Sequence, residues 1–260
     1  MSFSFLNLEL TSRCNKSCWM CGRRRMEKER PDLADWGDMP AELVAEISHQ
    51  RPLGIAIQFH NNGEPLLYPL LAWALRSFPG NIRCLNTNGK LLLEKDEAII
   101  GHLETLTISI IENDPEGDEQ YEIVRRFLEK KGSNKPLVVY RLLGKVDGSE
   151  RWKRLPGLLT RRVLHSPYGS REYRKPAVIP EIGVCLDLLT HLAIDRKGNV
   201  SMCVRFDPEG DLRLGNVGNM SLEECWRSEK RRRYINWHLA GQREMLPGCN
   251  RCDYWGVPRG

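Results

Sequence analysis

The chain has 260 residues, of which 41% are hydrophobic and 28% charged, and its formal net charge is +5. This length predicts one or two domains with a substantial core, and the composition excludes collagen-like and low-complexity classes. No apolar stretch approaches the ~18 residues of a membrane span, and the first ten residues lack the basic segment of a signal peptide. We therefore expect a cytoplasmic protein without a membrane association. Nine cysteines in a reducing compartment favour metal or redox chemistry over disulfides.

Segments of strand character alternate with segments of helical periodicity along the first two-thirds of the chain. The expected strands are residues 5–10, 55–59, 82–86, 106–111, 137–143 and, weakly, 163–165. The expected helices are residues 40–48, 67–77, 91–102, 118–131 and, weakly, 148–158. Serial βα units predict an α/β fold with a parallel sheet. Right-handed crossovers can curl such a sheet into a partial (β/α)6 TIM-like barrel, with functional groups at the carboxyl ends of its strands.

The last third of the chain has a different pattern, which predicts a second, smaller domain. Residues 166–182 are rich in Pro, Gly, Tyr and Arg and are interpreted as a linker between a barrel at 1–165 and a domain at 183–260. Residues 191–195 and 199–205 predict a β-hairpin turning at Lys197-Gly198, and residues 207–219 predict a loop. Ser221-Leu-Glu-Glu has the pattern of a capping box and predicts a helix that continues to about Leu239.

Three cysteines lie close together just after the first expected strand, at the functional end of the predicted barrel. Cys14, Cys18 and Cys21 have the spacing C-x3-C-x2-C. Three thiolates in one loop can bind three corners of a [4Fe–4S] cluster and leave the fourth iron open to a ligand. A zinc site that takes a fourth ligand from elsewhere in the chain is the alternative.

The segment Thr11-Ser-Arg-Cys-Asn-Lys-Ser-Cys-Trp-Met-Cys-Gly resembles the signature loop of the radical S-adenosylmethionine (radical SAM) enzymes. Asn62-Gly-Glu-Pro, directly after the second expected strand, resembles the Gly-Glu-Pro motif of the same family, although such a sequence can also form a simple turn. The resemblance implies that the open iron binds the amino and carboxylate groups of SAM. One electron from the cluster then releases a 5′-deoxyadenosyl radical, which abstracts hydrogen from the substrate.

The resemblance also implies a set of SAM-binding residues. They are Met20, Gly63, Glu64, Pro65, Asn88, Ser109 and Arg141. Glycine permits a close backbone approach, and arginine suits the planar carboxylate of SAM, although Arg141 also fits a strand end at the edge of the core. The chain departs from the family at Ile111-Glu112, where Asp-Gly is common. That departure leaves the substrate-side loop open, and no motif assigns a catalytic acid or base.

Four further cysteines form a second group, Cys185, Cys203, Cys249 and Cys252. The spacing of the first two resembles the opening of the SPASM domain, a C-terminal module of many radical SAM enzymes, and the short remainder resembles its smaller twitch version. Four thiolates would ligate one auxiliary [4Fe–4S] cluster completely, with a four-cysteine zinc site as the alternative. A β-hairpin and a helix are expected around this site. Cys84 and Cys225 are expected to be small buried apolar residues.

A fully ligated second cluster suits electron transfer, so the resemblance implies two [4Fe–4S] clusters, SAM and a net oxidation. Hydrogen abstraction, loss of a proton and transfer of an electron to the auxiliary cluster would convert an alcohol to a ketone in a sugar or cyclitol-like small molecule. The size and the cysteine layout are most similar to those of the 2-deoxy-scyllo-inosamine dehydrogenases. A flavodoxin- or ferredoxin-type protein would supply electrons.

Three alternatives remain open. A maturase that modifies a ribosomally made peptide is disfavoured, because the first expected strand begins near Phe5 and leaves no room for an N-terminal peptide-recognition domain. A non-enzymatic metal-binding protein would require the two motifs to be coincidental. RNA modification would use the basic runs 23–25 and 230–233, which also fit solvated surfaces; nucleic acid is not expected, because no recognisable RNA-binding motif accompanies them.

Overall fold

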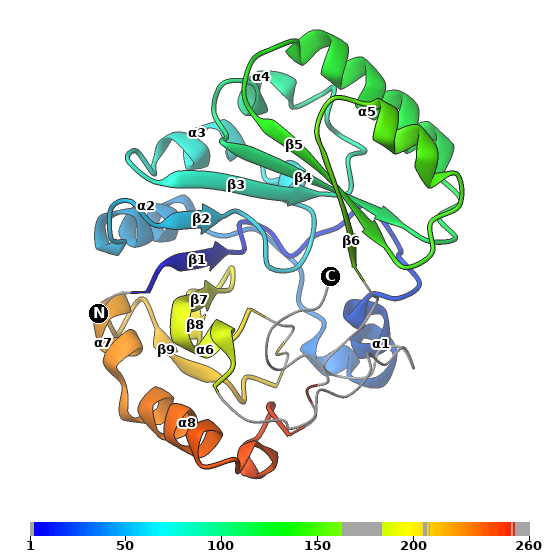
Figure 1. The fold of residues 1–260 in the computed structure, drawn as a ribbon. Helices are drawn as coiled ribbons and strands as arrows, with labels where there is room; N and C mark the ends of the chain where they lie inside the picture. The colour runs from blue at the N-terminus through cyan, green and yellow to red at the C-terminus, as the bar shows by residue number, and fades with distance from the viewer. Residues whose placement is uncertain (1–2, 163–183, 205–206, 208, 251, 253–260) are drawn as a thin grey trace.

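The computed structural model describes residues 3–162, 184–204, 207, 209–250 and 252. In this part of the chain one nine-stranded sheet has the order β6-β5-β4-β3-β2-β1-β7-β8-β9 (Figure 1). The strands are β1 (Phe5–Leu8), β2 (Ala56–Gln58), β3 (Ile82–Thr87), β4 (Thr105–Ile111), β5 (Leu137–Leu143), β6 (Leu158–Arg162), β7 (His191–Ile194), β8 (Asn199–Ser201) and β9 (Arg213–Asn216). Neighbours among β1 to β7 pair in parallel, whereas β8 pairs antiparallel with both β7 and β9. The predicted α/β fold with serial parallel strands is confirmed.

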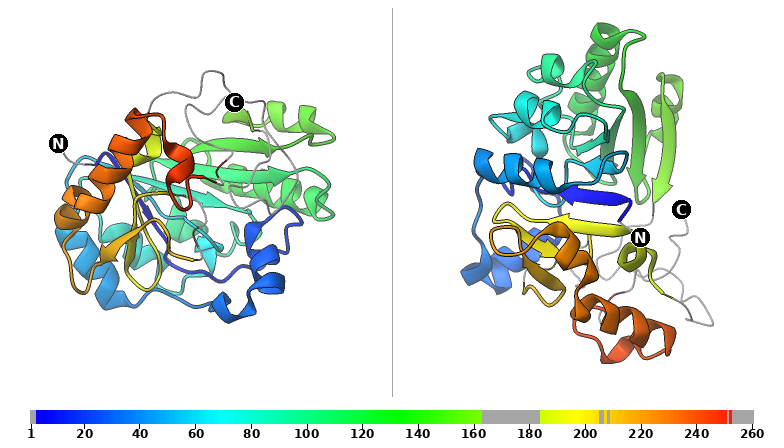
Figure 2. Two further views of the ribbon diagram at one scale, coloured as in Figure 1. Left: turned by 90° about the horizontal axis from the view of Figure 1, so that it is seen from below. Right: turned by 90° about the vertical axis from the view of Figure 1, so that its left-hand side faces the viewer.

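Helices cover the outer side of this sheet, and further helices pack beside β7–β9 (Figures 1 and 2). The α-helices are α1 (Gly22–Glu29), α2 (Ala41–Gln50), α3 (Leu71–Arg76), α4 (Asp96–Ile99), α5 (Gly117–Lys131), α6 (Leu186–Thr190), α7 (Leu222–Arg227) and α8 (Glu229–Leu239). Short 3-10 turns are η1 (Pro31–Leu33), η2 (Pro65–Leu67), η3 (Ser149–Arg154) and η4 (Arg243–Met245). None of the described helices combines the length and the apolar character of a transmembrane span.

The two faces of the sheet differ because side chains alternate along each strand. In β5, Val138, Tyr140 and Leu142 are buried in the main core under the helices, where removal of apolar area from water stabilises the fold by roughly 25 cal/mol per Å². The residues between them point to the concave inner face. Arg141 is one of these, and it lies in register with Ser109 of β4. The main core therefore lies between the sheet and the helices, and polar groups line the opposite, inner face of the sheet.

Several expected elements are shorter than the sequence suggested. The helix expected at 91–102 is helical only in α4, because Leu91–Leu93 pack against the core from turns. The weak helix at 148–158 is the 3-10 turn η3, whose Trp152 is buried, and Pro156 follows too closely for a longer helix. The sixth strand is β6, just before the expected residues 163–165. Those three residues and the linker 166–182 lie outside the described residues.

The C-terminal third contains the expected hairpin and capping box, together with elements that the sequence did not predict. β7 and β8 form the hairpin, with Gly198 at a left-handed φ of 81°. β9 lies within the expected loop 207–219. Helices α1 and α6 were also not expected. The single helix expected from Ser221 is two helices, because Ser228 is extended and its side chain accepts from Arg231 N to begin α8.

The capping box at the start of α7 gives a direct test of local stability. Ser221 accepts from Glu224 N, and the Glu224 carboxylate accepts from Ser221 N at 2.8 Å. Ser221→Ala is expected to lower the free energy of unfolding by about 1 kcal/mol, measured by urea denaturation. Ser133→Ala, at an exposed position between α5 and β5, is the control. Equal losses of stability in the two variants would show that the Ser221 side chain does not stabilise the start of α7.

Candidate functional site

The loop that carries Cys14, Cys18 and Cys21 rests on the backbone that follows β2. Gly63 has a φ of 75°, and a Cβ atom there would lie 2.4 Å from Thr11 O and 2.7 Å from Arg13 O. Glu64 N donates to the same Arg13 O at 2.7 Å. Only glycine permits so close an approach of two backbone segments. The Gly-Glu-Pro segment thus fixes the start of the cysteine loop.

The Glu64 side chain joins the carboxyl ends of β2 and β3. Its Oε1 accepts from Leu66 N at 3.0 Å and from Thr87 Oγ1 at 2.7 Å, and its Oε2 accepts from Asn88 N at 2.7 Å. Burial raises the pKa of Glu64 to about 7, although these hydrogen bonds lower it. The resemblance to the radical SAM enzymes implies that Glu64 binds SAM. In the structure this carboxyl group already has three donors, so it also organises the site.

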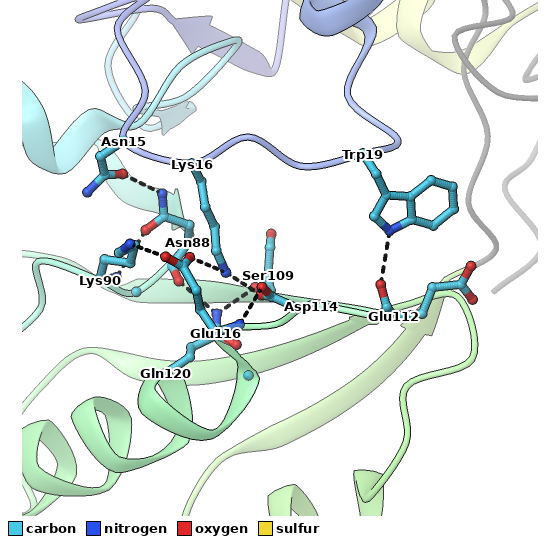
Figure 3. Close-up of polar contacts among 12 residues, drawn as sticks. Asn15, Lys16, Trp19, Asn88, Lys90, Ser109, Glu112, Asp114, Glu116 and Gln120 are labelled. Atoms are coloured by element: carbon cyan, nitrogen blue, oxygen red, sulfur yellow. Dashed lines mark hydrogen bonds and ion pairs between the residues drawn. The ribbon is translucent and has the colours of Figure 1, made fainter.

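Asn88 and Gln120 connect three elements of the site (Figure 3). Asn88 Nδ2 donates to Asn15 Oδ1 of the cysteine loop at 2.8 Å. Gln120 Nε2 donates to Asn88 O at 2.7 Å and to Ser109 O at 2.9 Å. Sequence reasoning missed Gln120, which is 1% exposed. The available signal was a glutamine on the buried stripe of α5, beside Val124 and Phe127.

The cysteine loop also contacts the loop between β4 and α5. Trp19 Nε1 donates to Glu112 O at 3.0 Å, and the Lys16 ammonium pairs with Asp114. A cavity of about 480 Å³ lies between these loops. Glu112, the residue at which the chain departs from the family, is buried and its Oε2 accepts from Lys145 N at 2.5 Å. The departure therefore has a structural role in joining β4 to the end of β5.

Two further polar contacts support the same region. Arg13 donates to both carboxylate oxygens of Asp38, at 3.0 and 2.7 Å. The buried Glu9 side chain accepts from Asn62 N at 3.2 Å and Asn62 Nδ2 at 3.0 Å, and from Arg196 N at 3.4 Å. Burial raises the pKa of Glu9. Glu9 thereby joins β1 both to the Gly-Glu-Pro segment and to the hairpin of the C-terminal third.

The three cysteines of the first group are half-buried free thiols. Burial raises the pKa of Cys18 to about 11, and the nearby Cys21 and Cys14 raise it further while Lys16 lowers it. In the described part of the chain, no three His, Cys, Asp or Glu side chains are arranged to hold a single metal ion. The donor chemistry nevertheless fits an iron–sulfur cluster, because three thiols and a cation share one short loop.

The second group of cysteines surrounds a small separate core of Leu188, Met202, Leu212, Tyr234 and Leu246. Cys185, Cys203 and Cys249 pack against this core, and Cys252 N donates to Cys249 O at 3.1 Å. Burial raises the pKa of Cys249 to about 12, with further contributions from Cys252 and Cys185. Four cysteines gathered in this region fit one fully ligated cluster.

Met20, Pro65 and Arg141 are three further residues expected to bind SAM. Met20 is half-buried in the cysteine loop, and Pro65 is buried at the start of η2. Burial lowers the pKa of His60 to about 4, and the positive charge of Arg141 lowers it further. In the adjacent strands β2 and β3, Gln58 Nε2 and Asn86 Oδ1 are buried without a hydrogen-bond partner in the described chain. Such polar atoms are suited to a bound ligand.

The remaining cysteines and the basic runs have structural surroundings. Cys225 is fully buried in the main core, as expected, and Cys84 is half-buried within β3. Arg23 is buried and stacks over Trp36, with 4.0 Å between the guanidinium carbon and the ring centroid. Arg231 is buried over Trp226 at 3.3 Å. A continuous phosphate-binding patch is therefore not favoured.

Comparisons with known proteins agree with this geometry. The iron–sulfur cluster-binding domain SPASM matches residues 185–253. The S-adenosyl-L-methionine-dependent 2-deoxy-scyllo-inosamine dehydrogenase of Niallia circulans is 24% identical over 261 residues, covering 96% of this chain and 93% of that protein. The structure of BtrN in complex with AdoMet and 2-DOIA has a TM-score of 0.64 at 19% identity, covering 98% and 95% of the two chains. That of anSMEcpe with bound AdoMet has a TM-score of 0.61 at 15% identity, covering 90% and 80%.

These findings confirm the expected similarity: residues 185–253 match the SPASM domain, and the whole chain is similar to a SAM-dependent 2-deoxy-scyllo-inosamine dehydrogenase. They support the expected cofactors, SAM and iron–sulfur clusters, and they give no support to the peptide-modifying alternative.

The contact of Gly63 with the cysteine loop predicts an unusually severe glycine substitution. Gly63→Ala is expected to lower the free energy of unfolding by at least about 2 kcal/mol more than Gly101→Ala, because its Cβ meets backbone oxygen. Gly101 is the matched control, since its φ is 81° but the space around it is open. Urea denaturation of both variants measures the difference, and equal losses would contradict the steric argument.

The raised pKa of Glu64 predicts a dependence of stability on pH. In the folded chain its carboxyl group holds a proton up to about pH 7, whereas its ordinary pKa is 4.5. Its contribution to stability is therefore full below pH 4.5 and is lost as the pH rises to about 7. Relative to Glu64→Gln, the free energy of unfolding of the cluster-free wild type should fall by up to about 3 kcal/mol across this range. If the difference in free energy of unfolding between wild type and Glu64→Gln does not change with pH, the raised pKa of Glu64 is refuted.

Proposed function

We propose that the chain is a radical SAM dehydrogenase that oxidises an alcohol group of a cyclitol-like small molecule, such as an aminocyclitol, to a ketone. The observation that carries the proposal is the presence of both a three-cysteine loop at the carboxyl ends of the parallel strands and a separate four-cysteine group around its own small core. The similarity to a SAM-dependent dehydrogenase over 96% of the chain supports the same reaction class.

The residues of the inner face would bind SAM and substrate. Cys14, Cys18 and Cys21 would hold the first [4Fe–4S] cluster, which with bound SAM supplies a 5′-deoxyadenosyl radical. Arg141 would hold the SAM carboxylate, because a guanidinium suits a planar partner. The backbone of Gly63–Pro65, Asn88 and Ser109 would line the same site with Met20. The hydrogen-bond network through Glu64 and Gln120 would keep these groups in place, and the enclosing barrel would exclude water.

The C-terminal region would accept the second electron. We propose a barrel at 1–165, a linker at 166–182 and a twitch-type domain at 183–260, with Cys185, Cys203, Cys249 and Cys252 holding the auxiliary cluster. Loss of hydrogen, a proton and an electron oxidises the substrate by two electrons in total. A flavodoxin- or ferredoxin-type protein would supply the electron for the first cluster. Arg243, which donates to Cys249 O at 2.5 Å and to Cys252 O at 3.2 Å, would hold the last turn in position.

Two measurements test the metal content and the role of the first loop. Anaerobic reconstitution should give about eight irons per chain, as two cubane clusters require; about four irons with zinc would exclude the auxiliary cluster. Replacement of Cys14, Cys18 and Cys21 by alanine should abolish reductive SAM cleavage while about four irons remain. Cys225→Ala is the control and should retain SAM cleavage, because Cys225 belongs to neither cysteine group. Cleavage by the triple variant would show that this loop is not the radical-generating site.

The substrate class is tested by turnover. The reconstituted enzyme with reductant and 2-deoxy-scyllo-inosamine should form 5′-deoxyadenosine and a ketone in equal amounts, measured by mass spectrometry. The Cys249→Ala variant should still form 5′-deoxyadenosine but lose most of the ketone, because the second electron has no acceptor. SAM cleavage without oxidation of any cyclitol by the wild type would reject the substrate class and retain the enzyme class.

A further inference from the structure

Lys16 is a buried cation in the middle of the cysteine loop, two residues from both Cys14 and Cys18. Its side chain is 5% exposed and its ammonium pairs with the Asp114 carboxylate, whose side chain is 8% exposed. Glu116 Oε2 lies 3.6 Å from the same ammonium. Both carboxylates belong to the loop between β4 and α5 (Figure 3). Lys16 therefore joins the cysteine loop to a segment 98 residues further along the chain.

Burial sets this ion pair apart from an ordinary surface contact. Exposed pairs contribute little, because water and salt screen them. When one partner of a buried pair is removed, the other charge stays away from water without compensation, which is strongly destabilising. The neighbouring Lys90–Glu116 pair has the same chemistry, but its side chains are 25% and 35% exposed. The carboxylates of the two pairs lie on the same loop, so the more exposed Lys90–Glu116 pair is a matched comparison for the buried Lys16–Asp114 pair.

Neutral hydrogen bonds hold the cysteine loop in the same position. Trp19 Nε1 donates to Glu112 O at 3.0 Å, and Asn15 Oδ1 accepts from Asn88 Nδ2 at 2.8 Å. Arg24 Nη2 donates to Lys16 O at 3.0 Å and fixes the backbone of Lys16 itself. Asn15 and Trp19 hold the loop through neutral hydrogen bonds, whereas the Lys16 side chain between them carries a positive charge. The positive charge of Lys16, two residues from both cysteines in the same loop, also favours the more negative, reduced state of any cluster that they bind.

We propose that the Lys16–Asp114 ion pair is a latch that holds the cysteine loop in its cluster-binding conformation and makes Lys16 a positioning residue for the cluster. The proposal rests on the proposed function, since it takes Cys14, Cys18 and Cys21 as cluster ligands. Asp114 holds the ammonium beside the loop, and the ammonium offsets the negative charge of the thiolates. Loss of either partner should loosen the loop, and loss of the Lys16 ammonium should also make the cluster harder to reduce.

The test compares full-length reconstituted variants. Lys16→Met and Asp114→Asn should release iron from the first site to a chelator about tenfold faster than wild type, and the swapped variant Lys16→Asp/Asp114→Lys should recover most of this loss. Lys90→Met is the matched control and should behave as wild type. The midpoint potential of the first cluster, measured by spectroscopic redox titration, should be lower in Lys16→Met. Release at the wild-type rate, or equal acceleration in Lys90→Met, would overturn the latch.

A cluster-free readout separates failure of the latch from failure of the proposed function. In the full-length chain before reconstitution, alkylation of Cys18 by iodoacetamide, measured against Cys84 in the same molecules, should be about tenfold faster in both Lys16→Met and Asp114→Asn than in wild type. Loss of the Lys16 positive charge alone would slow this reaction, so a faster reaction in Lys16→Met reports a loosened loop. Asp114→Asn keeps the side-chain size and provides the second variant. An unchanged alkylation ratio would reject the latch. A wild type that binds no SAM-cleaving cluster but shows the faster alkylation would reject the proposed function alone.

Discussion

The close approach of the Gly63–Glu64 backbone to Thr11–Arg13 is the constraint on which the rest of the site depends. Two backbone segments can meet at this distance only where no Cβ intervenes, and one hydrogen bond, from Glu64 N to Arg13 O at 2.7 Å, fixes their register. Every contact further along the cysteine loop starts from that point. The same two residues then lead through the Glu64 carboxyl group to Thr87 and Asn88 at the end of β3.

A buried polar network of this kind stabilises one arrangement because its members have few alternative partners. Glu64 accepts three hydrogen bonds, and Gln120 joins Asn88 to Ser109. Burial of Glu64 raises its pKa to about 7, so the charge that strengthens these hydrogen bonds is itself costly in the folded chain. The network positions groups around the inner face at the expense of some stability, which is common where a site must bind a ligand.

The sequence predicted the features that depend on local pattern. Strand periodicity located the serial parallel sheet, and the Ser221 capping box located the start of α7. Features that depend on distant partners were missed. Gln120 is an ordinary helix residue until α5 packs against β4, and Lys16 is an ordinary loop lysine until Asp114, 98 residues away, is placed beside it. β9 lies within a predicted loop, because Gly210, Gly215 and Gly218 suggest turns there, whereas pairing with β8 decides its conformation.

The position of the two cysteine groups relative to each other follows from the pairing of β1. β1 pairs with β2 on one side and with β7 on the other, so the hairpin of the C-terminal third hydrogen-bonds directly to the first strand of the chain. Glu9, just beyond β1, accepts from Asn62 of the Gly-Glu-Pro segment and from Arg196 of the hairpin. The proposed electron transfer requires that the two cysteine groups stay at one separation. The continuous sheet through β1 and the buried Glu9 carboxyl group join the two parts of the chain that carry these groups.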